Sequence, residues 1–264
     1  MGAGAAGSAL GGVAMPAIVK AQTGLRVRPN IADLDNDHPI LVAYKAAVTE
    51  MKRRSQVNPS DPTGWTAQAQ IHNTRCPHSN WYFFPWHRAY LLAFEDICRQ
   101  ASGNPDFALP YWDWTQQRTL PAAVTDAGTP DAPNPLLDTT REAGANDQLQ
   151  VLQQTEPDFV ATILQLPEFE TFGGQAIRGQ TSSRSTDWQI RGRNESEPGG
   201  VEGQLEGGPH NQVHATIGGN MGDFLSPLDP IFWLHHCNVD RMWVVWSQCA
   251  SGGARSKVTR FFSA

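Results

Sequence analysis

The stretch Asp229–Trp243 reads DPIFWLHHCNVDRMW and carries the strongest structural signal in this 264-residue chain. Its first two residues are an N-cap and a first-turn proline, which predict a helix through the residues that follow. His235 and His236 are adjacent in that helix. Because neighbouring helical residues point about 100° apart, only one of them can face a given ion directly.

Asp240 shares a helical stripe with His236, one turn further on. A carboxylate in that position is expected to accept the far N–H of a metal-binding imidazole and so fix its tautomer. We therefore predict His236 as a metal ligand, Asp240 as its hydrogen-bond partner, and His235 as a neighbour that packs or hydrogen-bonds beside them.

Upstream of this helix, His210 and His214 are separated by four residues. That spacing puts two imidazoles on one helix face, about 5–6 Å apart at Cβ, where they can hold one ion together. Pro209 suits the first turn of such a helix, and Gly218 would end it. His210, His214 and His236 form one predicted ligand set.

A second set is formed by His72, His78 and His87. Nine residues separate the last two, so they would point to opposite sides of a continuous helix. Pro77 and Pro85 therefore favour His78 on a loop and His87 in the first turn of a helix running to residue 99. His72 is expected at the end of a short helix over residues 65–71.

All-imidazole coordination suits copper, zinc, iron or nickel. The lack of carboxylate donors in both sets disfavours calcium and magnesium, and the lack of thiolate donors disfavours a blue-copper electron-transfer site. Three neutral donors leave each metal an open position. Copper explains six histidines better than a dizinc hydrolase, which normally includes carboxylates. His38 is left over and is expected to be a hydrogen-bonded histidine without a metal role.

Composition and periodicity indicate a single, mainly helical domain over residues 22–264 with long irregular loops. The formal net charge is −6 and only 17% of residues are charged, with no basic block, so nucleic acid is not an expected partner. Helices are predicted over residues 39–54 and 157–166. Residues 116–148 are expected to form a long surface loop, and residues 173–208 are rich in Gly, Ser and Arg.

Residues 1–21 are small and mostly apolar, with Lys20 as the single charge. We interpret them as the remnant of an export signal, which would place the mature protein in the periplasm or outside the cell. A disordered leader with no targeting role is the alternative. The segment is too short and too rich in glycine for a stable membrane span.

The two histidine sets, read with their flanking residues, resemble the copper motifs of the tyrosinase and catechol oxidase (polyphenol oxidase) family. The matching stretches are His72, Cys76–His78 with Pro85–Arg88, His210–His214 with Asp229–Arg241, and the aromatic segment Phe107–Trp114 (FALPYWDW). The resemblance covers roughly residues 26–246.

This resemblance implies a four-helix bundle around a dinuclear type-3 copper centre. His72, His78 and His87 would bind the first copper ion, and His210, His214 and His236 the second. Phenolic compounds would be the substrates, dioxygen the co-substrate, and a copper-delivery protein a candidate partner.

Cys76 lies two residues before His78. In fungal members of the family, a cysteine at this spacing is joined to the histidine by a thioether bond, which here would fix the loop-borne ligand. An unmodified buried cysteine or a disulfide partner is the alternative. No function is predicted for Cys98, Cys237 and Cys249.

Glu206 and Asn211 resemble the pair proposed in tyrosinases to hold a water molecule that takes the phenolic proton. On that basis we expect monophenol hydroxylation as well as catechol oxidation, although Glu206 would have no such role if it were a solvated loop acid. Phe224 and Ala215 are expected at the substrate pocket, where Phe224 would restrict the substrate ring; ordinary loop packing is its alternative.

The family's domain starts with an Arg that meets a Tyr-containing motif at the domain's end. Arg26–Pro29 resembles that start, but the last tyrosine here is Tyr111, so we expect an incomplete or unusually short C-terminal end and an open site. Two alternative functions remain. One is a strict catechol or ortho-aminophenol oxidase, and the other is an oxygen carrier of the haemocyanin kind.

Overall fold

The computed structural model describes residues 26–175 and 201–248. The predicted export leader, Cys249 and most of the Gly-, Ser- and Arg-rich passage lie outside these ranges. None of the helices in the described part has the length and apolar character needed to cross a membrane.

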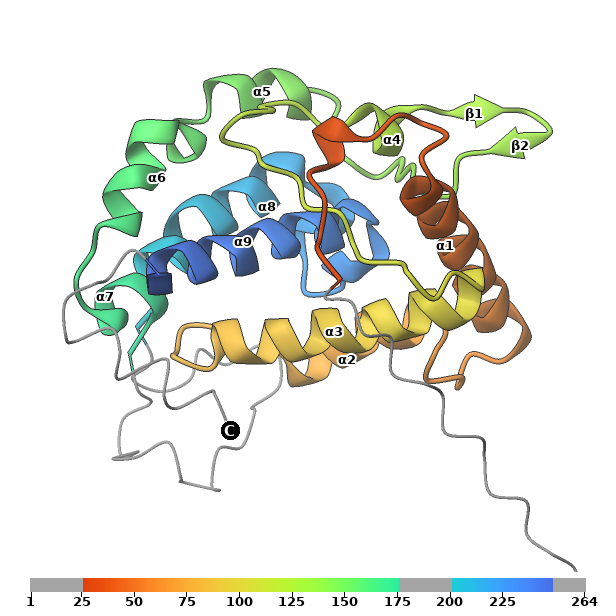
Figure 1. Cartoon of the computed structure of the whole chain (residues 1–264), viewed down its shortest axis with the longest axis horizontal. Coiled ribbons are helices and arrows are strands. Elements are labelled where there is room, and N and C mark those ends of the chain that lie inside the picture. The colour runs from red at the N-terminus through yellow and green to blue at the C-terminus, as the bar shows by residue number, and fades with distance from the viewer. Residues whose placement is uncertain (1–25, 176–200, 249–264) are drawn as a thin grey trace, which may run out of the picture.

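Two helix pairs form the centre of the molecule. α2 (Trp65–Arg75) lies beside α3 (Phe83–Ser102), and α8 (Asn211–Ile217) lies beside α9 (Ile231–Gln248) (Figure 1). α3 packs directly against α9. The mainly helical bundle predicted from the sequence is confirmed.

The predicted start of α9 is confirmed in atomic detail. The Asp229 carboxylate accepts the Ile231 backbone N–H at 3.0 Å, as an N-cap does, and is itself held by the Arg141 guanidinium at 2.6 and 2.7 Å. Nearly the whole of this helix is buried, so its histidines lie in the interior and not on a surface.

α1 (Pro39–Val57) covers one side of α3, and its first turn is capped by His38, whose Nδ1 accepts the Ile40 N–H at 3.2 Å. His38 therefore serves the backbone, in agreement with its predicted lack of a metal role. The chain before α1, which includes the short helix η1 (Ile31–Asp33), pairs with Tyr111 through two backbone hydrogen bonds of 2.9 Å.

Residues 116–148, predicted as a surface loop, are more ordered and more buried than expected. They hold the short helix α4 (Ala122–Thr125), a hairpin of β1 (Gly128–Thr129) and β2 (Ala132–Pro133), and the start of α5 (Ala145–Val151). Leu120, Val124 and Leu136 are buried in the core. The prediction was wrong because isolated apolar residues without helical or strand periodicity still anchor a segment to a core.

The remaining short elements connect α5 to α9. They are η2 (Gln153–Thr155), α6 (Pro157–Leu164), α7 (Phe169–Gly173), η3 (Glu206–His210), η4 (Gly219–Gly222) and η5 (Ser226–Leu228). η3 is divided by a kink at Gly208, whose backbone angles (φ −91°, ψ −107°) are not helical. The helical turn that leads into α8 therefore begins at Pro209, in agreement with its predicted first-turn position.

Candidate metal centre

The second histidine set converges on one point. His210 Nε2 and His214 Nε2 each lie 3.3 Å from His236 Nε2. The i, i+4 pair comes from the end of η3 and from α8, and the third ring comes from α9. The structure therefore brings together the three residues predicted from spacing, and a ring nitrogen of His235 also lies within 4.8 Å of theirs.

His235 is held by the aromatic segment. Its Nδ1 accepts the Trp114 indole N–H at 3.2 Å, and its ring stacks on His210 at 5.3 Å between centroids. Because Nδ1 accepts a hydrogen bond, the proton of the neutral ring is on Nε2, so His235 has no free lone pair for a metal. This agrees with its predicted place beside the ligands.

Asp240 does not contact His236, and its predicted role as partner of that ring is wrong. One of its carboxylate oxygens accepts from Arg88 at 2.7 Å, and the other accepts from Arg28 at 2.9 Å. His236 Nδ1 is buried and has no hydrogen-bond partner. Two cations on distant parts of the chain outcompete a neutral imidazole for the carboxylate.

The first set, His72, His78 and His87, forms a triangle with ring centroids 5.6–5.7 Å apart. His72 lies in the last turn of α2, which extends four residues beyond the predicted end. His87 lies in α3, which begins at Phe83, so this ring starts the second helical turn and not the first. His78 lies on the connecting loop, as predicted from the prolines.

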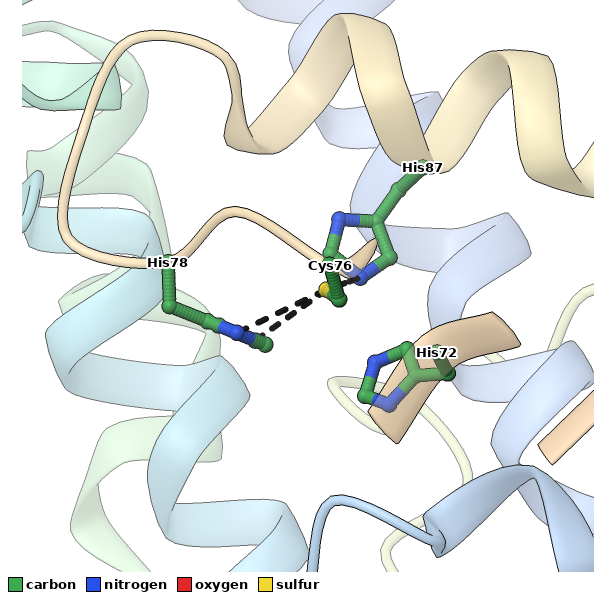
Figure 2. A group of neighbouring side chains, drawn as sticks. All are labelled: His72, Cys76, His78 and His87. Carbon is green, nitrogen blue, oxygen red and sulfur yellow. Dashed lines mark hydrogen bonds between the residues drawn. The ribbon is translucent and has the colours of Figure 1, made fainter. Parts of the chain in front are cut away.

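Cys76 lies inside this triangle (Figure 2). Its Sγ is 3.5 Å from His78 Nδ1, 3.9 Å from His78 Nε2 and 3.3 Å from His87 Nε2. The sulfur therefore lies near both nitrogens of the His78 ring, which flank the carbon Cε1. The thiol is buried, as are those of Cys98 and Cys237, and all three are free in the described part of the chain.

Tautomers in both sets direct lone pairs inward. The Nδ1–H groups of His72, His87 and His214 donate to the backbone carbonyls of Phe224, Phe83 and Met221, each at 2.7 Å, and His210 Nδ1–H donates to Asn211 Oδ1 at 2.9 Å. Each of these rings therefore carries its lone pair on Nε2.

The arrangement of these rings fits bound metal ions better than a core in which the imidazoles only hydrogen-bond to one another. His236 Nε2 can give a proton to only one of the two lone pairs that face it, and His72 Nε2 is buried without any partner. Such orphaned acceptors are costly unless something binds them. Burial also lowers the pKa of His72 to about 3 and that of His214 to about 4, so the rings are neutral donors at physiological pH.

The two sets face each other across the bundle. His87 of α3 and His236 of α9 stack at 4.3 Å between centroids and 10° between planes. Two fully buried rings frame them: Phe83 lies 4.5 Å from His87 and 4.8 Å from His210, and Phe232 lies 4.2 Å from His236 and 5.0 Å from His72. The sequence analysis missed both phenylalanines, although each stands four residues before a ligand.

Glu206 is fully buried, which excludes the alternative of a solvated loop acid. Its Oε1 accepts the backbone N–H of Ser79 at 2.8 Å, and its Oε2 has no partner. Burial raises the pKa of the carboxyl group well above its ordinary value. Glu206 therefore lies beside the loop that carries His78, with one oxygen free to accept a hydrogen bond.

Asn211 and Glu206 share no hydrogen bond in the structure. The Asn211 side chain connects His210 to Glu202, whose Oε2 accepts its Nδ2–H at 3.1 Å. The other oxygen of Glu202 accepts from the Ser79 hydroxyl at 3.1 Å. Glu202 thus links the His78 loop to a ligand of the second set, a role that the sequence analysis did not find because the contact with Ser79 spans 123 residues.

Phe224 packs its ring edge-on against His78 at 5.2 Å and near His72 at 6.3 Å, so it lies over the first set. It is partly exposed, as a residue between solvent and a ligand set must be. Ala215 follows His214 in α8 and is exposed. Both predicted pocket residues therefore lie next to ligands.

A helical bundle with two facing histidine triads defines a class of proteins that hold a pair of metal ions, and each cluster is suited to one ion. The sequence model of the common central domain of tyrosinase matches residues 50–249. This chain belongs to the tyrosinase and polyphenol oxidase family, a type-3 copper family, as the sequence resemblance implied.

Individual relatives agree with this assignment. The chain is 31% identical over 265 residues to tyrosinase HcTyr1 of Hahella sp. (strain CCB-MM4), covering 84% of this chain and 53% of that protein. It is 32% identical over 266 residues to a chloroplastic polyphenol oxidase of Malus domestica, covering 89% and 42%. The chain thus spans about half the length of these relatives.

Solved structures give the same fold. Latent apple tyrosinase matches with a TM-score of 0.64 at 28% identity, covering 89% of this chain and 55% of that one. A recombinantly expressed latent aurone synthase, described as a polyphenol oxidase, matches with a TM-score of 0.66 at 25% identity, covering 87% and 49%.

Proposed function

We propose that this protein oxidises phenols with dioxygen at a dinuclear copper centre, ortho-hydroxylating monophenols and oxidising ortho-diphenols to ortho-quinones. The observation that carries the proposal is the inward direction of the Nε2 lone pairs in two facing triads. His72, His78 and His87 would hold one copper ion, and His210, His214 and His236 the other. Copper bound there would supply the electrons that reduce dioxygen.

Monophenol hydroxylation needs a base, because the phenol must lose its proton before it reacts. Glu206 supports this step, since its Oε2 is buried, unpartnered and close to the His78 loop. Burial raises the pKa of its carboxyl group, so its ionised form is a stronger base than an ordinary carboxylate. A water molecule between Glu206 and Asn211 would carry the proton.

The test compares two isosteric variants, Glu206→Gln and Glu202→Gln. Glu206→Gln is expected to lower the kcat for tyrosine by about 10²-fold or more while catechol oxidation falls by less than about threefold. Glu202→Gln keeps the buried base and removes a partner of Asn211, so it should affect both substrates equally and modestly. Equal losses on both substrates in Glu206→Gln would contradict the assignment.

A Cys76–His78 thioether is the second part of the proposal. Cys76 Sγ lies 3.5 and 3.9 Å from the two nitrogens that flank Cε1 of His78, which supports a C–S bond to Cε1 that replaces the S–H and C–H bonds. The two electrons and two protons released would go to dioxygen, giving hydrogen peroxide. Copper-loaded protein should lose one titratable thiol and the mass of two hydrogen atoms, and Cys76→Ala should lose neither.

Two alternatives are separated by one measurement, oxygen uptake by copper-loaded protein with tyrosine, catechol and ortho-aminophenol. Uptake with catechol or ortho-aminophenol but not with tyrosine would favour the strict oxidase. Reversible oxygen binding without turnover of any substrate would favour a carrier. The buried Glu206 carboxyl group, with Oε2 free of any partner, favours the hydroxylase, since neither alternative needs a base at that place.

A further inference from the structure

The two sites have the same spacing of metal-binding side chains on their first helix, but the residue type differs at one position. In the second site, His210 and His214 form the i, i+4 pair that precedes the α9 ligand. In the first site the residue four positions after His72 is Cys76, whose backbone N–H donates to the His72 carbonyl at 3.1 Å and so continues α2 by one more residue. A thiol thus occupies the place that an imidazole has in the other site.

Each site also has a fourth side chain within 4.8 Å of the three ligands, Cys76 in the first and His235 in the second. His235 cannot bind a metal in its present tautomer, because its Nδ1 lone pair is taken by the Trp114 N–H. Nothing comparable occupies the sulfur of Cys76. Its contacts are two imidazoles of the site and the Pro77 carbonyl, which is 3.9 Å away.

The distances around the sulfur suit a tetrahedral ion. With metal–sulfur and metal–nitrogen bonds of about 2.3 and 2.05 Å, a tetrahedral zinc site separates sulfur and nitrogen by about 3.6 Å. The Sγ of Cys76 lies 3.3 Å from His87 Nε2 and 3.5 and 3.9 Å from the His78 nitrogens. The sulfur therefore lies close to the required distance from two of the three imidazoles, and all four ligand atoms lie within 4.8 Å of one another.

We infer that, while Cys76 is unmodified, the first site is a closed Cys/His₃ site that binds a d¹⁰ cation such as Zn²⁺, with Cys76 as the fourth ligand. Thiolate and imidazole donors together select zinc, and four protein ligands leave no open position. Such an ion would block the first site until Cys76 is cross-linked or the ion is removed. The inference rests on the proposed function of the same site.

The experiment uses the full chain, produced without copper and kept reduced, and titrates it with Co²⁺. A thiolate-to-cobalt band in the near ultraviolet is expected to saturate at one equivalent and to disappear when Zn²⁺ is added. The all-imidazole second site cannot give this band, so it serves as an internal control. Absence of the band in the wild-type protein overturns the inference whether or not any variant folds.

Two variants sharpen the test. Cys76→Ser should lose the band and bind Zn²⁺ at the first site about 100-fold more weakly, whereas Cys98→Ser, which removes a buried thiol away from the site, should keep both. A band that persists in Cys76→Ser would also overturn the inference. Catechol oxidation by a separate copper-loaded sample tests the proposed function independently: turnover without the cobalt band refutes only the inference, and the band without turnover refutes only the function.

Discussion

The two histidine sites differ in what holds their ligands in place. In the second site all three rings come from helical segments, and two of them are oriented by hydrogen bonds at Nδ1. In the first site His78 lies on a loop, and its Nδ1 faces a thiol and not a carbonyl group. Two rings in each site are oriented by hydrogen bonds at Nδ1, so the sites differ at one ligand: helical segments carry all three rings of the second site, whereas the position of His78 in the first depends on contacts around its loop.

Those contacts come partly from the second half of the chain. The loop residue Ser79 donates its backbone N–H to Glu206 and its hydroxyl to Glu202, and Glu202 also holds Asn211. The loop of the first site is therefore held by Glu202 and Glu206, which lie just before the ligands of the second site in the chain. The predictions below test this difference, beginning with an effect that both sites share.

The largest expected effect is acid unfolding of the metal-free protein. Seven buried histidines have lowered pKa values, with desolvation by burial as the main cause: His72, His78, His87, His210, His214, His235 and His236. Below about pH 6.5 the unfolded chain binds more protons than the folded chain does. The free energy of unfolding therefore decreases as the pH is lowered. At about 1.4 kcal/mol per group and pH unit, about two units can remove the roughly 5–15 kcal/mol that hold a domain together.

Denaturant midpoints measured from pH 8 to pH 4 check this prediction. Glu206 and Asp229 act in the opposite direction, because their raised pKa values make their contributions fall as pH rises above about 4, but they are two groups against seven. Metal bound to the native state adds stability and moves the transition to lower pH. A metal-free protein equally stable at pH 5 and pH 8 would show that the rings are not desolvated.

The next effect concerns the adjacent histidines of α9. His236→Ala should lower the metal affinity of the second site by more than about 100-fold, beyond the cost of losing an outer hydrogen-bond partner. His235→Gln retains an acceptor for the Trp114 indole and should keep both metal ions. Metal content after dialysis measures the difference, and loss of one ion from both variants would mean that His235 also binds.

The sequence was sufficient for the six converging histidines because helix periodicity, the Asp229 N-cap and the prolines place each ring on a known face or loop. It failed for Asp240, because an i, i+4 spacing says which residues can meet and not which partners compete for them. Arg28 and Arg88 lie 212 and 152 positions away from Asp240 along the chain. The link through Glu202 escaped prediction for the same reason.

A variant of Asp240 separates its role as a counterion of two arginines from its predicted role as a partner of His236. Asp240→Asn should cost about 2–4 kcal/mol of unfolding free energy, because Arg28 and Arg88 lose a largely buried counterion. Metal affinity at the second site should stay unchanged, since His236 does not contact the carboxylate. Glu95→Gln removes only one partner of Arg28 and serves as the milder control. A 10–100-fold loss of metal affinity in Asp240→Asn would restore its predicted role.

The smallest effect tests how firmly the first site's loop is held. Ser79 has a φ of 59°, a left-handed conformation that costs a residue with a side chain about 1 kcal/mol and costs glycine almost nothing. Ser79→Gly and Ser79→Ala both lose the hydroxyl that binds Glu202 and keep the N–H that binds Glu206. Because they differ mainly at this φ, the glycine variant should be more stable by about 0.5–1 kcal/mol in urea unfolding. If the alanine variant were the more stable one, the loop would not hold this conformation in solution, and the first site would lack the support that Glu206 gives it.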